Sequence, residues 1–89
     1  MWLKKILRAA LLAIIALPLL AAAYAVAARF TTEREAQAHC PTDVVVWVNL
    51  PTGVYHFKGQ RWYGSTKSGA YECRNEADQE GSRPTNNGQ

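Results

Sequence analysis

The sequence predicts a small α+β domain behind an apolar N-terminal segment, and three observations support this fold class. The composition of the 89 residues changes sharply near Phe30, which leaves one domain of about 50 to 60 residues. Most aromatic and β-branched residues beyond that point lie between Val44 and Cys73, and the two cysteines bracket this segment. We therefore expect an antiparallel β-hairpin or three-stranded sheet with one or two short helices.

Residues 1–30 are predicted to be a signal anchor or a signal peptide. An unbroken apolar run from Ala9 to Ala28 follows Lys4, Lys5 and Arg8, and it is long enough to cross a hydrocarbon core of about 30 Å as a helix. Positive charge before the run favours an N-terminus inside the cell.

Two interpretations of this leader remain open. An uncleaved anchor would make the membrane a partner through residues 9–28, in an inner-membrane protein with its C-terminal domain in the periplasm. A cleaved signal peptide would use the A-x-A patterns within residues 21–25, and the mature chain would be secreted or free in the periplasm. Both interpretations predict export.

The charge distribution argues against a nucleic-acid partner. The formal net charge is +3, from ten basic and seven acidic residues. Four of the ten basic residues flank the apolar run, namely Lys4, Lys5, Arg8 and Arg29, so six basic residues face seven acidic ones in the remainder. The basic character therefore belongs to the targeting segment, and the domain itself is slightly acidic.

The domain begins with a short helix and a hairpin. Residues 31–39 are predicted to be a short helix or linker, because Thr32 and Glu35 have capping-box spacing and Pro41 disfavours helical geometry at Cys40. Residues 42–50 are predicted to form a strand covered on both faces, because the side chains of a strand point alternately to its two faces and apolar residues fall on both. The turn residues Pro51 and Gly53 then lead into a second strand, Val54 to Phe57.

The second half of the domain contains shorter elements. Residues 61–63 are predicted to be extended, residues 64–69 to be a loop, and residues 70–72 to be a last strand. A helix over residues 74–80 is expected to begin near Cys73 and to end at Gly81. Residues 82–89 contain no apolar side chain, which predicts a disordered tail.

The two cysteines favour a disulfide. Cys40 and Cys73 would close the β-rich domain over residues 40–81 in an oxidising compartment. The alternative is a zinc site made by His39, Cys40, His56 and Cys73, although no C-x-x-C or H-x-x-x-H spacing is present. We therefore expect no metal and no other cofactor.

Basic and aromatic residues interleave in the middle of the domain, where no carboxylate occurs between Asp43 and Glu72. Such a pattern is typical of a surface that stacks on a ligand, or of aromatic side chains that simply build a small core. No Ser/His/Asp or Cys/His arrangement indicates catalysis, so no catalytic residue and no enzyme is predicted. The expected binding face consists of His56, Arg61, Trp62, Tyr63 and Lys67.

Several short motifs lie between Cys40 and Pro84, namely Trp47 to Asn49, Gly53 to His56, Arg61 to Gly64, Thr66 to Gly69, Tyr71, Glu76, Ala77, Gly81 and Arg83. Together they resemble a small module of exported bacterial proteins whose function is uncharacterised. More distantly, the hairpin, the Tyr-His pair and the Gly-x-Arg-Pro ending are similar to the metal-binding domain of the alkylation-repair protein Ada. Those modules use several cysteines, whereas this chain has residues 57–59 and Thr85 at the corresponding places.

Together these observations predict a membrane-tethered or secreted, non-enzymatic envelope or interaction module, whose partner is an envelope protein or polymer. The alternative function is a zinc-binding or nucleic-acid-binding accessory domain of the Ada-like type.

Overall fold

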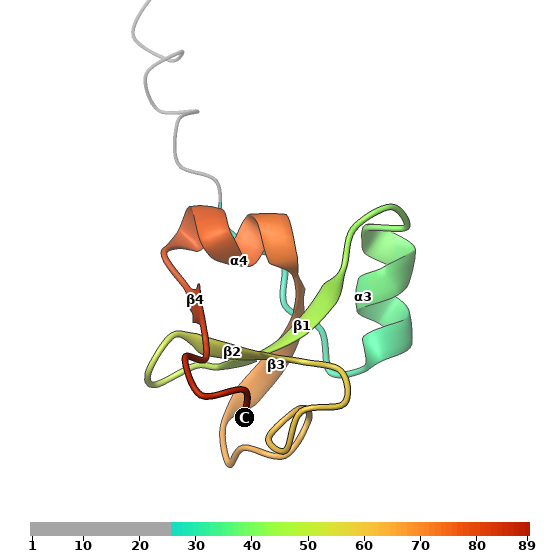
Figure 1. Ribbon diagram of the computed structural model, residues 1–89. Helices are drawn as coiled ribbons and strands as arrows, with labels where there is room; N and C mark the ends of the chain where they lie inside the picture. The colour runs from blue at the N-terminus through green and yellow to red at the C-terminus, as the bar shows by residue number, and fades with distance from the viewer. Residues whose placement is uncertain (1–25) are drawn as a thin grey trace, which may run out of the picture.

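The computed structural model describes residues 26–89, which form a four-stranded mixed sheet with two short helices (Figure 1). The strands lie in the spatial order β3, β1, β2, β4. In this part of the chain, no helix is long and apolar enough to cross a membrane. The predicted membrane segment, residues 9–28, lies outside the described residues except for its last three positions.

Three neighbouring strands of the sheet are antiparallel, with β1 between β3 and β2, as the sequence predicts. β1 (Val45–Asn49) pairs with β2 (Val54–Phe57) as a hairpin. β3 (Gly69–Cys73) pairs antiparallel with the other edge of β1. These strands contain the β-branched and aromatic residues that favour a pleated, half-buried surface.

The fourth strand corrects the prediction of a disordered tail. β4 (Arg83–Pro84) runs parallel to β2. The backbone N–H of Arg83 donates to the carbonyl of Gly53 at 2.9 Å, and that of Thr85 donates to Tyr55 at 3.1 Å. Backbone hydrogen bonds need no apolar side chain, so a polar composition did not reveal this strand.

Both short helices are present at their predicted places. α3 (Glu33–His39) begins at Thr32, whose hydroxyl accepts a hydrogen bond from the Glu35 backbone N–H at 3.2 Å. α4 (Arg74–Glu80) follows β3 directly and ends at Gly81, which has a left-handed φ of 99°.

Residues 61–63 are not extended, which corrects a second prediction. The N–H of Tyr63 donates to the carbonyl of Gln60 at 3.2 Å, and the N–H of Ser65 donates to Trp62 at 3.0 Å. The segment is therefore a pair of consecutive turns. Gly64, with a φ of 69°, allows the chain to reverse here.

The two helices cover opposite faces of the sheet. Residues that face each other in antiparallel strands point to the same side, so Val46, Val48 and Tyr55 share one face. Ala77 of α4 packs into this apolar cluster. On the other face, Ala36 is fully buried in α3, near the end of β3. α3 and α4 flank the sheet in Figure 1.

A disulfide joins Cys40, directly after α3, to Cys73 at the end of β3, as the sequence predicts. The two Cα atoms are 6.2 Å apart, and the residues are 33 positions apart in sequence. The disulfide fixes α3 over one end of the sheet face that this helix covers. The loop over residues 58–68 and the last residues of the chain lie at the other end of the same face, near the β1–β2 turn.

Candidate functional site

A hollow of about 500 Å³ opens at this second end of the sheet. Three segments form it: the β1–β2 hairpin, the loop over residues 62–67 that follows soon after, and the distant C-terminal residues 85–89. Its lining is aromatic, hydroxylic, amidic and basic, and it contains no carboxylate side chain. The lining residues are Asn49, Thr52, Val54, His56, Trp62, Ser65, Thr66, Lys67, Thr85, Asn87 and Gln89.

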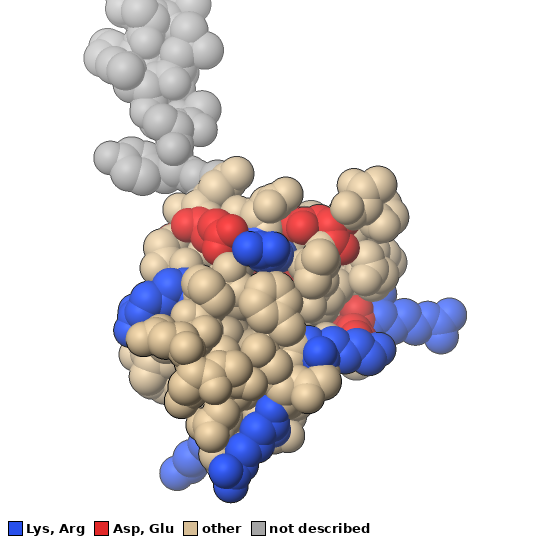
Figure 2. Space-filling model, viewed as in Figure 1, with Lys and Arg blue, Asp and Glu red and all other residues tan. Residues whose placement is uncertain are grey.

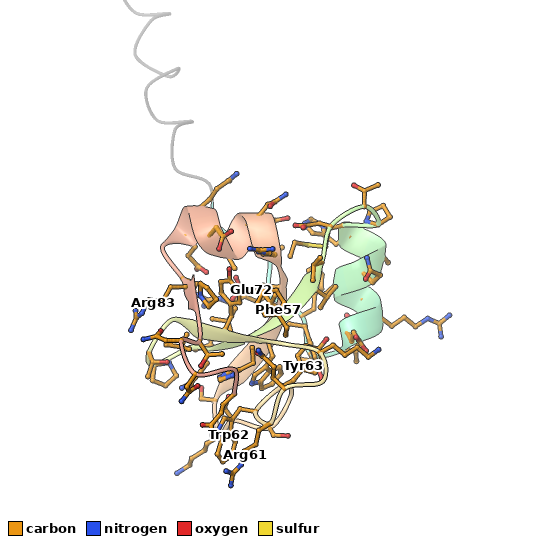
Figure 3. All side chains as sticks on the ribbon, viewed as in Figure 1. Phe57, Arg61, Trp62, Tyr63, Glu72 and Arg83 are labelled. Carbon is orange, nitrogen blue, oxygen red and sulfur yellow. A yellow bond between two sulfur atoms is a disulfide. The ribbon has the colours of Figure 1, made fainter. Side chains whose placement is uncertain are left out.

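Three residues of the predicted binding face, His56, Trp62 and Lys67, line this hollow. Arg61 lies beside it, because its guanidinium carbon is 4.8 Å from the centroid of the Trp62 ring. Figure 3 shows both side chains together at the end of the molecule opposite α4.

Tyr63 lies elsewhere. Its hydroxyl donates to Glu33 at 2.9 Å, and its ring packs edge-on against Tyr71 with 5.5 Å between the centroids. Burial, followed by the hydrogen bond to the Glu33 carboxylate, raises the pKa of Tyr63 well above its ordinary value. This side chain therefore fixes the loop to α3, and the hollow has no contribution from it.

His56 provides a polar atom without a partner. The residue is only 6% exposed, and its Nδ1 has no hydrogen-bond partner among the described residues. It lies directly opposite Trp47 in the β1–β2 pairing. A buried polar atom without a hydrogen bond costs free energy, and Nδ1 is closed to solvent in this conformation.

The hollow is held in shape by contacts between its segments. The indole N–H of Trp47 in β1 donates to the hydroxyl of Thr66 in the loop at 2.7 Å. This bond attaches the loop to the sheet. The backbone N–H of Trp62 donates to the carbonyl of Gln89 at 3.1 Å. The loop and the C-terminal residues are therefore attached to each other at the rim.

Trp62 is the aromatic residue that the hollow presents to solvent. Its exposed fraction is 39%, and the other exposed large apolar residues in the described chain are Val26 and Val44. Neither valine lines the hollow. In the view of Figure 2, basic side chains project at this end, whereas most acidic ones gather at the end where α4 lies.

A second feature of the structure is a buried carboxylate, that of Glu72, and the sequence analysis did not predict it. Glu72 is fully buried, and its carboxylate oxygen lies 3.6 Å from Nε of Arg29. Burial, together with the negative charge of Glu80, raises the pKa of Glu72 to about 7. One feature of the sequence could have indicated this burial: side chains alternate between the two faces of β3, which puts Glu72 on the same face as buried Ala70.

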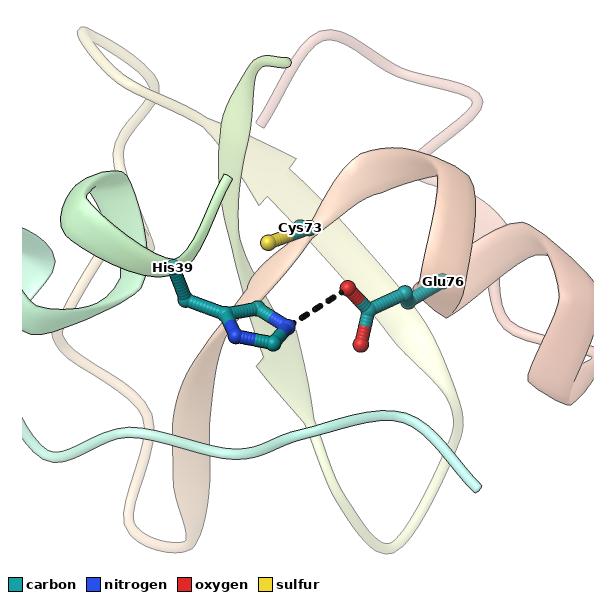
Figure 4. A group of neighbouring side chains, drawn as sticks. All are labelled: His39, Cys73 and Glu76. Carbon is teal, nitrogen blue, oxygen red and sulfur yellow. Dashed lines mark hydrogen bonds and ion pairs between the residues drawn. The ribbon is translucent and has the colours of Figure 1, made fainter. Parts of the chain in front are cut away.

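His39, Cys73 and Glu76 form the cluster drawn in Figure 4, where donor atoms of all three lie within 4.8 Å of one another. The imidazole Nε2 of His39 is 2.9 Å from the Glu76 carboxylate. The Cys73 sulfur is bonded to Cys40, however, and so provides no thiolate for a metal. The residues present do not fit a zinc ion.

The zinc set considered from the sequence is therefore wrong as a set of ligands. Cys40 and Cys73 are bonded to each other. His56 is in β2, which is separated from Cys73 in β3 by the whole of β1.

Sequence reasoning missed the amide and hydroxyl side chains of the hollow. Asn49 is the last residue of β1, Thr66 falls in a loop, and Asn87 and Gln89 fall in the expected tail, where such residues are common and uninformative.

Comparison with known proteins finds no matching family model, no matching curated protein and no matching solved structure.

Proposed function

We propose that this chain is an exported, non-enzymatic binding module of the cell envelope, and that the hollow beside Trp62 is its ligand site. The observation that carries the proposal is the convergence of His56, Trp62 and Lys67 on one hollow whose lining contains no acidic side chain. Binding sites commonly combine one aromatic contact with a few polar groups.

The same hollow is poorly equipped for catalysis. A general base or a nucleophile needs a hydrogen-bonded partner that orients or activates it. His56 Nδ1 has no such partner among the described residues, and no acidic side chain or cysteine lines the hollow. These features support recognition rather than reaction.

Two features support export. The apolar run follows a cluster of basic residues, and the domain contains a disulfide, which persists in oxidising compartments. The domain also holds the last residue of the run and the residue after it: the N–H of Ala28 donates to Glu76 at 3.1 Å, and Arg29 pairs with Glu80 at 2.7 Å. An uncleaved leader would keep the domain close to the membrane surface.

Export is tested by fusing alkaline phosphatase or a green fluorescent protein to the C-terminus of the full chain in a Gram-negative bacterium. If the domain is exported, we expect the phosphatase fusion to be active, because this enzyme needs oxidised disulfides. We expect the fluorescent-protein fusion to be non-fluorescent after export. The control is the Ile14→Glu/Ile15→Glu variant, which interrupts the apolar run. An inactive phosphatase with a bright fluorescent protein in the unmodified chain would refute export.

Binding is tested by sedimenting the full chain, in a neutral detergent, with insoluble envelope polymer prepared from the same bacterium. We expect Trp62→Ala and Lys67→Gln each to reduce the sedimented fraction. Tyr63→Phe is the matched control, because Tyr63 is an aromatic neighbour in sequence that does not line the hollow. Sedimentation that is absent, or equal in all variants, would contradict the proposed site.

A further inference from the structure

We infer that the hollow binds an acidic polysaccharide, with a sugar ring against the indole of Trp62 and an anionic group near Lys67. This inference rests on the proposed function and specifies the ligand class for the same site. Three observations support it: the exposed indole, the mixed amide and hydroxyl lining, and the absence of acidic side chains from that lining.

The indole provides the contact for a sugar ring. One face of a pyranose presents C–H groups, and these are attracted to the electron-rich face of an aromatic ring. Trp62 is 39% exposed at the rim, where a ligand can reach it without rearrangement of the fold. Arg61 lies against the same ring at 4.8 Å from its centroid, and this contact restricts the motion of the indole.

The polar lining matches the chemistry of sugar hydroxyls, which donate and accept hydrogen bonds at once. Hydroxyl and primary amide side chains have the same double capacity, and seven such side chains line the hollow: Asn49, Thr52, Ser65, Thr66, Thr85, Asn87 and Gln89. His56 also lines the hollow, although its Nδ1 is closed to solvent.

The charges select an acidic sugar over a neutral one. Lys67 lines the hollow and Arg61 borders it, and no acidic side chain is among the lining residues. The buried and half-buried acids Glu72, Glu76 and Glu80 gather instead around Arg29 and α4. An anionic group of the ligand would therefore meet an ammonium group that no acidic side chain of the lining pairs with.

Nucleic acid and lipid fit these observations less well. Binding of single strands uses several cations along the backbone and successive aromatic platforms, whereas the hollow presents Trp62 alone with Lys67 and Arg61 beside it. A lipid surface needs a contiguous apolar patch. The other exposed apolar side chains, Val26 and Val44, do not line the hollow.

The test is a titration of the full chain, in a neutral detergent, with four probes followed by calorimetry. The probes are a hexagalacturonate, maltohexaose, a decathymidylate, and detergent-compatible bicelles that contain phosphatidylglycerol. We expect the hexagalacturonate to bind at least about tenfold more tightly than maltohexaose, because a charge-assisted hydrogen bond adds about that much affinity. Added salt should weaken the acidic probe alone.

The variants assign the binding to the hollow. We expect Trp62→Ala to lower the affinity for the hexagalacturonate by about tenfold or more. Lys67→Gln should lower it to the level of the neutral probe. Both side chains are exposed, so these variants should fold, and an unchanged circular dichroism spectrum verifies this. Tyr63→Phe should bind as the unmodified chain does.

The outcomes separate this inference from the proposed function. Equal affinity for the acidic and neutral sugars would overturn the requirement for an acid. Binding of the decathymidylate or the bicelles through Trp62, without any sugar, would overturn the polysaccharide inference and leave the hollow as a binding site. If no probe binds and envelope sedimentation is also insensitive to Trp62→Ala, the proposed function fails as well.

Discussion

The carboxylate of Glu72 is fully buried in the sheet, 3.6 Å from Nε of Arg29, which enters from the segment that follows the apolar run. Neither carboxylate oxygen of Glu72 has a hydrogen-bond partner among the described residues. Glu80 adds a second negative charge, because it also pairs with Arg29, at 2.7 Å. The fold therefore connects its core to the N-terminal segment through a costly, incompletely paired charge.

This arrangement predicts a pH dependence of stability. Burial and the charge of Glu80 raise the pKa of Glu72 from 4.5 to about 7 in the folded protein. The folded state then holds more protons at Glu72 than the unfolded state between these values, so the contribution of Glu72 to stability is greatest below pH 4.5 and is lost as the pH rises through 7. For the full chain in detergent, we expect the free energy of unfolding in urea to fall by up to about 3 kcal/mol.

Glu72→Gln tests this prediction, since it keeps the volume and removes the charge. The variant should be as stable as the unmodified chain at pH 4.5 and more stable than it at pH 8. The control, Glu35→Gln, changes an exposed carboxylate on α3 and should retain the full pH dependence. An identical pH profile for Glu72→Gln and the unmodified chain would rule out this role for Glu72.

The disulfide predicts a large loss of stability when it is removed. Cys40 and Cys73 close a loop over a separation of 33 residues, and a crosslink of that span stabilises by about 3 to 4 kcal/mol through the unfolded state. So small a domain has little stability beyond this. Thermal melting of Cys40→Ala/Cys73→Ala should show an unfolded or barely folded domain near 37 °C.

Two measurements complete that prediction. The intact mass of the purified chain without reductant should be lower by two hydrogen atoms than the mass with reductant, and it also reports whether the leader is cleaved. Ser68→Ala, an exposed substitution between the two cysteines, is the control for melting. A double variant that melts at the same temperature as this control would refute the stabilising role.

The centre of the sheet could be predicted from the sequence because its signals are local. Alternation of valines marks β1, Pro51 and Gly53 mark the turn, and Gly81 marks the end of α4. Each of these depends on one residue's backbone preference or on the spacing of near neighbours. The disulfide was predictable for a related reason, since only one pairing of two cysteines exists.

The parts that escaped prediction depend on distant partners. β4 forms because Arg83 and Thr85 find backbone partners on β2, and no side chain encodes this. Tyr63 turns away from the binding face because Glu33, thirty positions earlier, accepts its hydroxyl. Glu72 meets Arg29 only after β3 and the N-terminal segment are placed side by side. Local pattern contains none of these contacts.

Gly69 allows a prediction of the effect of a single added methyl group beside Trp47. A Cβ at this position would overlap the indole of Trp47, which also donates to Thr66 at 2.7 Å. Overpacking of this kind costs about 1 to 3 kcal/mol. Gly69→Ala should lower the urea midpoint, while the neighbouring Ser68→Ala should not; equal midpoints would show that the indole moves freely.

Tyr63→Phe distinguishes a structural role for Tyr63 from the binding role that the sequence suggested. The change removes the hydrogen bond to Glu33, so we expect a loss of stability of about 1 kcal/mol. Lys58 and then Tyr63 lower the pKa of Glu33, and the variant should therefore raise that pKa in an NMR titration. Ligand affinity should stay unchanged, because the side chain lies outside the hollow. A weaker ligand affinity with an unaltered pKa of Glu33 would restore Tyr63 to the binding face and refute the structural role.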